Sequence, residues 1–121
     1  MNKFRYSSVE LRRAKDEIRQ ILITKAKEGG TIIYSDLVSK VLSINLEPHS
    51  PILASLLGDI SEEENEHGRG MLSVIVVHKY GDMKPGPGFF ELAKSLGRDT
   101  SNILKCWINE LNKVYGNWND Y

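Results

Sequence analysis

Apolar residues recur at helical spacing near the start of the chain. They lie three or four residues apart and form one stripe: Leu11, Ala14, Ile18, Ile21, Leu22 and Ala26. Such a stripe is typical of an amphipathic helix that packs one face against a core. Ser7 and Glu10 have the spacing of a capping box, which predicts a helix start near Ser8. The glycine pair at 29–30 predicts its end.

Two more helices are expected in the middle of the chain. A short strand over Thr31–Tyr34 leads to Ser35, a favourable N-cap, and the helix after it carries Leu37, Val38, Val41 and Leu42. Ser50 followed by Pro51 predicts the next start, because proline is favoured at the first helical position. That helix buries Leu53, Leu56, Leu57 and Ile60. The acidic residues 62–66 predict a solvated exit or loop.

The second half of the chain predicts one strand and two helices. Met71–Tyr80 has β-branched residues on both faces, so we expect the main strand there, buried centrally. Two prolines and two glycines exclude regular structure from Lys84–Gly88. A short helix is expected over Phe89–Leu96, ended by Gly97. Caps at 99–101 predict a last helix that bears Ile103, Leu104, Trp107, Ile108, Leu111, Val114 and Tyr115.

This order of elements predicts an α+β fold. Helix, short strand, two helices and a long strand match a winged-helix-like body up to about residue 85, and two additional C-terminal helices would pack over the sheet. With 121 residues and 40% apolar content, the whole chain, 1–121, fits a single domain with one core.

Charge and composition favour a soluble protein. The net charge is zero, yet residues 1–30 hold eight Lys/Arg and four Asp/Glu, and residues 41–68 contain no Lys or Arg. No apolar run approaches the ~20 residues that cross a bilayer, and no signal-peptide pattern is visible at the N-terminus. The single cysteine, Cys106, fits a reducing compartment. We therefore expect a cytoplasmic protein without membrane contact.

The most distinctive stretch is Leu72–Arg98. It contains the motif PGPGFF at Pro85–Phe90, an apolar strand led by Leu72-Ser73, and a short helix closed by Leu96-Gly97. In these features, and in the Trp- and Tyr-rich segment from Trp107 to Trp118, the chain resembles a family of small, uncharacterised bacterial proteins. The resemblance implies no activity, because none is established for that family.

The PGPGFF loop is a candidate ligand site. Glycine lets backbone approach a ligand closely, and a helix start presents free N–H groups to an anion. The candidate contacts are Lys79, Lys84, Gly86, Gly88 and Phe89. Two features count against a site: the prolines donate no hydrogen bond, and with Gly88 as N-cap the carboxylate of Glu91 would occupy the helix start. A rigid elbow with both Phe rings in the core stays open as the alternative.

Other kinds of site find less support. The helix over 50–64 has no Lys or Arg, which argues against nucleic acid binding through it. The basic residues of the first helix (Arg12, Arg13, Lys15 and Arg19) leave a winged-helix DNA-binding regulator as an alternative. Cys106 has no nearby base, and His49, His67 and His78 lack metal-ligand spacing. We expect no catalytic residue, no metal and no cofactor, and the sequence favours a non-enzyme.

An interaction surface fits the sequence best. Four large aromatic residues gather near the C-terminus: Trp107, Tyr115, Trp118 and Tyr121. Such side chains are favoured in interfaces because they bury a large area and keep a polar group. We expect a non-enzymatic binding module that acts through protein contacts or self-association, using this C-terminus and the acidic segment 59–66. The alternative is a binder of a small anionic ligand, such as a nucleotide, at the PGPGFF loop.

Overall fold

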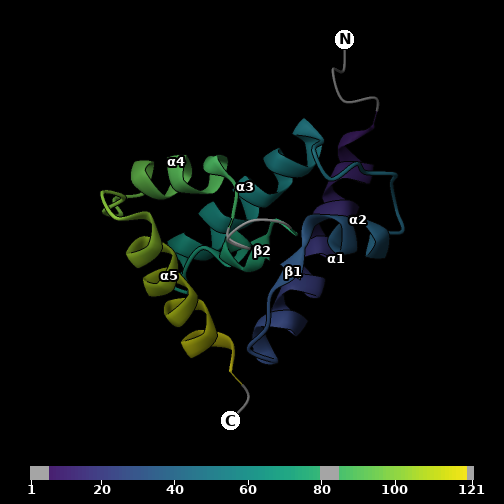
Figure 1. Ribbon diagram of the computed structural model, residues 1–121. Coiled ribbons are helices and arrows are strands. Elements are labelled where there is room, and N and C mark those ends of the chain that lie inside the picture. Colours follow the sequence, from purple (N-terminus) through teal and green to yellow (C-terminus); the bar gives the residue numbers. More distant parts are fainter. Residues whose placement is uncertain (1–5, 80–84, 120–121) are drawn as a thin grey trace.

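The fold is mostly helical, as the computed structural model of residues 6–79 and 85–119 shows (Figure 1). Five α-helices and a small parallel sheet make up the described part, which agrees with the broad α+β class. In chain order the elements are α1 (Ser8–Lys27), β1 (Ile32–Ile33), α2 (Tyr34–Lys40), α3 (Pro51–Glu66), the 3-10 helix η1 (Leu72–Ile75), β2 (Val76–Val77), α4 (Pro87–Ser95) and α5 (Ile103–Trp118).

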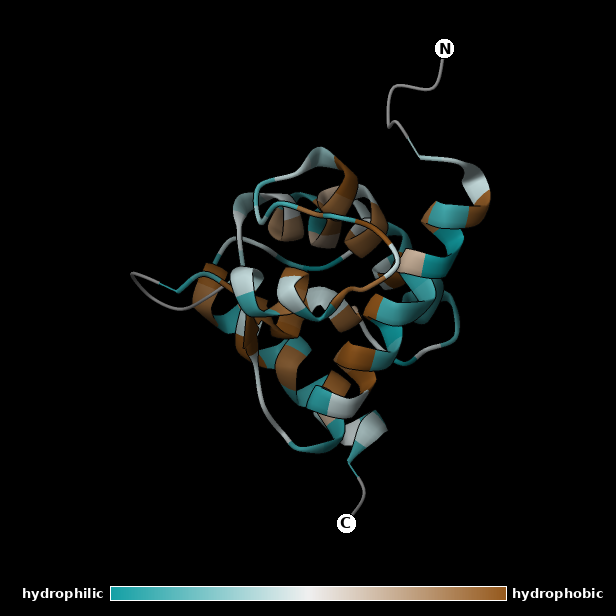
Figure 2. Ribbon diagram, turned by 90° about the vertical axis from the view of Figure 1, so that its right-hand side faces the viewer, coloured by the Kyte–Doolittle hydropathy of each residue, from teal (hydrophilic) through white to brown (hydrophobic). Residues whose placement is uncertain are grey.

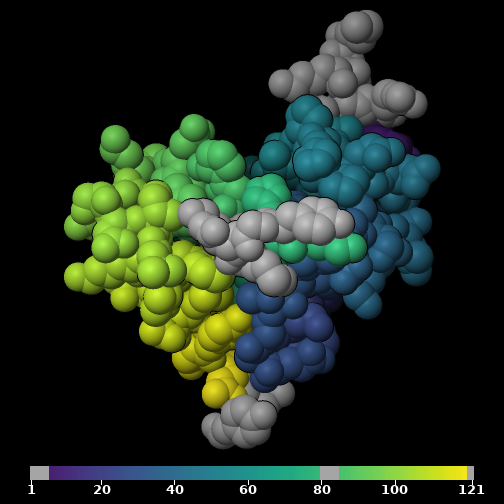
Figure 3. Space-filling view, viewed as in Figure 1, coloured from purple at the N-terminus to yellow at the C-terminus, as the bar shows by residue number. Residues whose placement is uncertain are grey.

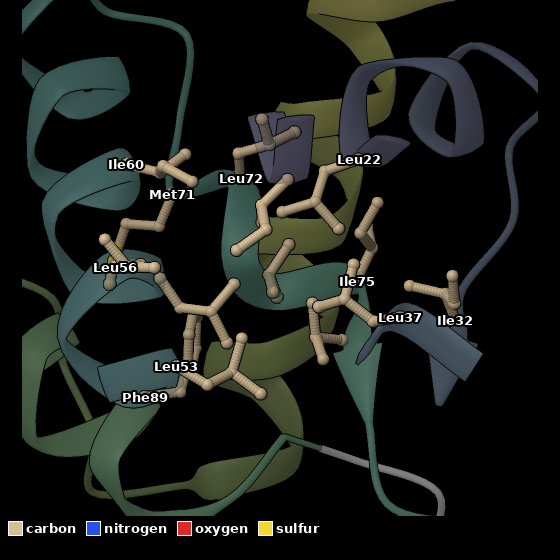
Figure 4. Packing of buried hydrophobic residues seen from close by; sticks show 14 of the residues in the cluster. Leu22, Ile32, Leu37, Leu53, Leu56, Ile60, Met71, Leu72, Ile75 and Phe89 are labelled. Carbon is tan, nitrogen blue, oxygen red and sulfur yellow. The ribbon is translucent and has the colours of Figure 1, made fainter. Parts of the chain in front are cut away.

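The centre of the fold is the segment Met71–Val77, in which every residue is buried. The helix η1 within it contacts α1, α3 and α5. Figure 4 shows Leu72 beside Leu22 and Ile75 beside Leu37. The hydrophobic faces of the helices turn towards this centre (Figure 2). The predicted central burial is therefore confirmed for Met71–Val77, whereas His78 and Lys79 are exposed.

The predicted main strand over Met71–Tyr80 is wrong in its conformation. Leu72–Ile75 form the 3-10 helix, and only Val76–Val77 pair with β1, in parallel, with Ile32 opposite Val76 and Ile33 opposite Val77. The physical reason is that helices surround the segment, so side chains replace the missing strands as hydrogen-bond partners. The N–H of Ser73 donates to Ser61 Oγ at 3.0 Å, and the N–H of Met71 donates to Glu110 Oε2 at 2.7 Å. Tyr80 lies outside the described residues.

The first helix follows its prediction closely. Ser7 Oγ accepts from the N–H of Glu10 at 3.1 Å, and Glu10 Oε1 accepts from the N–H of Ser7 at 3.0 Å, which completes the capping box. Four residues of the stripe are buried: Ala14, Ile18, Leu22 and Ala26. The helix ends before Gly29, whose φ of 72° is a conformation that glycine adopts without strain.

The second helix starts and ends earlier than predicted. Ile33, not Ser35, is the N-cap, and α2 stops at Lys40, so Leu42 lies outside the helix with 87% of its surface exposed. The loop after α2 is held by Glu17, whose carboxylate accepts from the N–H groups of Leu42 and Ser43, each at 2.9 Å. The proximity of Ser43, and then the hydrogen bond from Leu42, lowers the pKa of Glu17 below its ordinary value of 4.5.

The third helix begins as predicted but ends later. Ser50 Oγ accepts from the N–H of Ile52 at 3.1 Å, and Pro51 takes the first helical position. The acidic residues 62–66, predicted as a solvated exit or loop, are the last turns of α3. Their position is stabilised because Glu64, 1% exposed, and Glu63 find cationic partners on other segments.

The last two helices lie close to their predicted positions, but α4 ends at Ser95 and α5 continues to Trp118, and both starts differ from prediction. Gly86 is the N-cap of α4 and Pro87 its first residue, so the helix begins earlier than the predicted cap at Gly88. Asn102 caps α5, with its side chain accepting from the N–H of Lys105 at 3.0 Å. Both Phe rings of α4 are in the core, and they meet edge to face with centroids 5.2 Å apart.

A network of five charged residues joins α1 to the end of α3. Lys15 Nζ lies 2.7 Å from Glu63 Oε2, and Arg69 Nε lies 2.6 Å from Glu64 Oε1. Arg19 contacts both carboxylates. Hydrogen bonds from Lys15 to Glu63 and from Arg69 to Glu64 are the largest causes that lower the pKa of each carboxyl below its ordinary value of 4.5. The network explains how an acidic segment becomes part of the folded body.

We expect Glu64→Gln to lower the free energy of unfolding by about 2 kcal/mol near neutral pH. This loss is smaller than that for breaking a fully buried ion pair, because Arg69 is partly exposed. The pKa values of Glu63 and Glu64 are lowered by folding, so their contribution is complete above pH 4.5 and is lost as the pH falls through the folded values. Urea unfolding as a function of pH measures both effects. The exposed Glu66→Gln is the control, and an equal effect of the two substitutions would contradict the prediction.

Candidate functional site

A pocket of about 340 Å³ lies between α3 and α4, where the starts of α2, α3 and α4 meet the end of β2. Figure 3 shows the hollow between the green surface of α4 and the teal surface at the start of α3. Small-molecule sites have volumes of roughly 300–1,000 Å³, so this one suits a small ligand. The pocket is therefore the first candidate for a functional site.

The walls of the pocket are apolar. One face of α3 contributes Leu53, Ala54, Leu57 and Gly58. Leu57 lies one helical turn after Leu53, and Gly58 one turn after Ala54. The facing wall comes from Phe89 and Leu92 of α4. The predicted ligand contact Phe89 thus lines the pocket and also belongs to the core, with 8% of its surface exposed.

The parallel pairing of β1 and β2 brings Tyr34 and His78 together at the pocket. Ile33 lies opposite Val77 in the sheet. The residues that follow them, Tyr34 and His78, therefore lie at the same end of the strand pair, and both line the pocket. Their ring centroids are 5.0 Å apart, with 33° between the ring planes. The two side chains form one polar edge of the pocket, although 44 positions separate them in the sequence.

Three polar side chains of the pocket keep hydrogen-bonding capacity. Ser50 and Ser73 also line it, but Ser50 Oγ caps α3 and Ser73 Oγ lies 2.6 Å from Ser61 Oγ. Within residues 6–79 and 85–119, the rings of His49 and His78 have no hydrogen-bond partner. Tyr34 is the third group, and it accepts only a long bond of 3.5 Å, from the N–H of Gly86.

Tyr34 is a hydrogen-bond donor to the pocket at neutral pH. Burial raises the pKa of its hydroxyl above the ordinary value of 10.0, so the phenol keeps its proton. With the two imidazoles, which carry positive charge when protonated, the available polar groups of the pocket favour an acceptor or an anion.

The PGPGFF motif places its glycines at the pocket for different reasons. A Cβ on Gly86 would lie 3.0 Å from His78 Nε2 and 3.7 Å from Tyr34 Oη, so glycine permits the close approach of these side chains. A Cβ on Gly88 would meet nothing within 4 Å. Because the helix begins at Pro87, Glu91 lies four residues beyond it and is exposed, so the predicted competition by its carboxylate at the N3 position is wrong.

The structure brings together only part of the predicted ligand set. Gly86, Gly88 and Phe89 line the pocket. Lys79 is exposed and is not part of the lining, and Lys84 lies outside the described residues. Sequence reasoning missed Tyr34 and His49, because they come from separate segments and follow no spacing that would join them.

The predicted interaction residues of α5 pack mostly against the body. Tyr115 Oη donates to the carbonyl of Gly30 at 2.8 Å, and the guanidinium of Arg69 lies 5.6 Å from the ring centroid of Trp118. Trp107 and Trp118 are half-buried, and within the described residues their indole N–H groups are buried without a hydrogen-bond partner. Tyr121 lies outside the described residues.

The exposed apolar side chains of α5 lie beside these aromatic residues. Ile103, Leu104 and Ile108 are 36%, 58% and 44% exposed. In the acidic segment 59–66, by contrast, Glu63 and Glu64 are paired within the chain. The exposed large apolar groups of α5 are therefore aliphatic side chains.

Reactive and metal-binding groups do not gather in the described part of the chain. Cys106 is buried on α5, where burial, followed by the charge of Glu110, raises the pKa of its thiol. No group of three His, Cys, Asp or Glu residues within residues 6–79 and 85–119 has the geometry to hold a metal ion. None of the helices described there is long and apolar enough to cross a membrane.

Comparison of the chain with protein-family models, curated proteins and solved structures gave no match. The resemblance carried by Leu72–Arg98 therefore stays a prediction, and the pocket is interpreted from its own geometry.

We expect Gly86→Ala to separate the His78 and Tyr34 rings, because the new methyl group would lie 3.0 Å from His78 Nε2. Since His78 is exposed and can move, the free energy of unfolding should fall by only about 1 kcal/mol, the lower end of overpacking costs. NMR shifts of the His78 and Tyr34 rings measure the separation. Gly88→Ala, which meets open space, is the control, and equal ring shifts in both variants would refute the assignment.

Proposed function

We propose that this protein is a binding module that takes a small ligand in the pocket between α3 and α4. The observation that carries the proposal is the convergence of the PGPGFF motif with Tyr34, His49 and His78 around about 340 Å³ of space. Apolar walls with a few convergent polar groups are the usual composition of a ligand site. The proposal follows the small-ligand alternative from the sequence and places its contacts on the pocket.

A glycine in the wall supports the same conclusion. Gly58 lies in the interior of α3, where glycine costs about 1 kcal/mol relative to alanine. A Cβ at this position would meet only Leu92 Cδ2, at 4.0 Å, so packing against protein atoms does not require glycine. Its absent side chain instead leaves space in the pocket. The helix thus has glycine in place of the more stabilising alanine at the position where a ligand would lie.

We expect Gly58→Ala to raise the free energy of unfolding by about 1 kcal/mol. The same methyl group should weaken ligand binding by about fivefold or more, since ~1 kcal/mol of overpacking in the occupied pocket corresponds to that factor. A fragment screen by protein NMR finds the ligands, with the amide signals of Gly58, Gly86 and Phe89 as reporters, and titrations of wild type and variant compare affinities.

The matched control is Gly116→Ala, another glycine inside a helix with nothing within 4 Å of the added Cβ, on α5 and away from the pocket. It should gain stability without a change in binding. Fragments that bind without moving the three reporters, or that bind Gly58→Ala as well as wild type, would contradict the proposed site.

A second function is favoured by the exposed face of α5. Leu104 and Ile108 lie one turn apart on this helix and are both substantially exposed, and Ile103 is exposed at its first position. Contiguous exposed apolar groups are typical of contact surfaces. We propose that this protein also associates with itself or with a protein partner through α5.

The double variant Leu104→Asp, Ile108→Asp tests this second function. If the chain self-associates through α5, the mass from light scattering should fall to that of the monomer, because two charges cannot be buried unpaired in the contact. Asn109→Asp, on an exposed position of the same helix, serves as control and should keep the wild-type mass. A wild-type chain that is monomeric at every concentration measured would exclude self-association.

The DNA-binding alternative has the least support. Helix α3 carries no Lys or Arg, and two of the six Lys and Arg residues of α1, Lys15 and Arg19, are paired with Glu63 and Glu64. The winged-helix body remains a proposal supported by the order helix, strand, helix, helix. Phosphate contacts by α1 would depend on Arg12, Arg13, Lys25 and Lys27, of which Lys25 also lies 3.4 Å from Glu28, and these are few for stable DNA binding.

A further inference from the structure

We infer that the pocket takes a compact monocarboxylate, a molecule with an apolar body and one carboxylate group. This inference rests on the proposed function and names the chemical class of its ligand. The sequence led us to expect a small anionic ligand such as a nucleotide, and the inference restricts that class to monocarboxylates. Three properties of the pocket carry it: the charge of the lining, the kind of hydrogen-bonding group available, and the nature of the walls.

The charge of the lining favours one negative charge on the ligand. Among the described residues that line the pocket, none is Asp, Glu, Lys or Arg. Among these residues an anion therefore meets no repelling carboxylate, and a ligand with several charges meets no Lys or Arg to neutralise them. The imidazoles of His49 and His78 are the groups able to carry positive charge, which suits a single carboxylate.

The hydrogen-bonding groups favour an acceptor at the edge formed by Tyr34 and His78. The Tyr34 hydroxyl keeps its proton, and its contact with the Gly86 N–H leaves that proton free to donate. The His78 ring lies 5.0 Å from the Tyr34 ring, and Gly86 lets both remain close. Two donors on the same edge of the pocket can each contact an oxygen of one carboxylate, and hydrogen bonds to a charged acceptor are the stronger kind.

The walls favour a hydrocarbon body and disfavour a nucleotide. Beyond Tyr34 and His78, the ligand would contact the aliphatic groups of Leu53, Leu57 and Leu92 and the space left by Gly58. Hydrocarbon gains free energy when it is buried against such a surface. The ribose hydroxyls and phosphate oxygens of a nucleotide would lose their water there without finding partners, which is costly. A short acyl chain or a single ring fits the volume and the polarity.

Titration of the full chain with hexanoate, 1-hexanol and AMP, followed by NMR and calorimetry, tests the class. The three probes separate a carboxylate with a chain, the same chain without charge, and a nucleotide. We expect hexanoate to bind at least tenfold more tightly than 1-hexanol, and AMP to leave the signals of Gly58, Gly86 and Phe89 unchanged. Tyr34→Phe and His78→Gln should each weaken hexanoate by about tenfold, the effect of one hydrogen bond to a charged group. Both should leave 1-hexanol binding within twofold of wild type.

His67→Gln is the matched control, because His67 is exposed at the end of α3 and is not part of the lining, so hexanoate affinity should not change. Equal affinities of hexanoate and 1-hexanol would overturn the carboxylate contacts. Binding of AMP at the three reporters without binding of hexanoate would overturn the class and leave the proposed ligand site standing. If fragments, hexanoate, 1-hexanol and AMP all leave the reporters unchanged, both the class and the proposed function fail.

Discussion

The rest of this structure depends on one constraint, which is that the buried backbone of Met71–Val77 must find hydrogen-bond partners without a large sheet around it. An unpaired N–H in such a place costs about 1–3 kcal/mol. The side chains of Ser61 and Glu110 accept from two of these N–H groups, and β1 pairs with the last two residues of the segment. Helices α1, α3 and α5 can then pack around the centre because its polar groups are already engaged.

The same constraint positions the candidate site. Pairing in register fixes β2 against β1, and each strand is followed directly by a pocket residue, Tyr34 or His78. Both donors therefore directly follow the paired strands. The apolar walls come from helices α3 and α4, with Gly58 of one facing Leu92 of the other. The polar edge of the pocket thus depends on strand pairing, and its apolar interior depends on the packing of two helices.

Sequence patterns predicted what local interactions determine. The capping box at Ser7, the start at Ser50-Pro51 and the burial of both Phe residues follow from neighbours in the chain, and the structure confirms them. The η1 segment was predicted as a strand because β-branched residues favour strands, whereas the surrounding helices left it no partner strand. The burial of Glu64 depends on cations 45 positions before and five after it, which no local pattern reveals. The grouping of Tyr34, His49 and His78 is likewise a product of the tertiary fold.

The carboxylate of Glu110 links the centre of the molecule to its last helix. It accepts from the N–H of Met71 and forms two bonds of 3.0 Å with Arg98, while only 4% of its residue surface is exposed. Met71 and Glu110 are 39 positions apart in the sequence, so this N–H has no protein acceptor of this kind until α5 packs against the centre. Completion of the core therefore requires the C-terminal helix, and a chain shortened before α5 would leave a donor of its middle segment without the carboxylate that engages it.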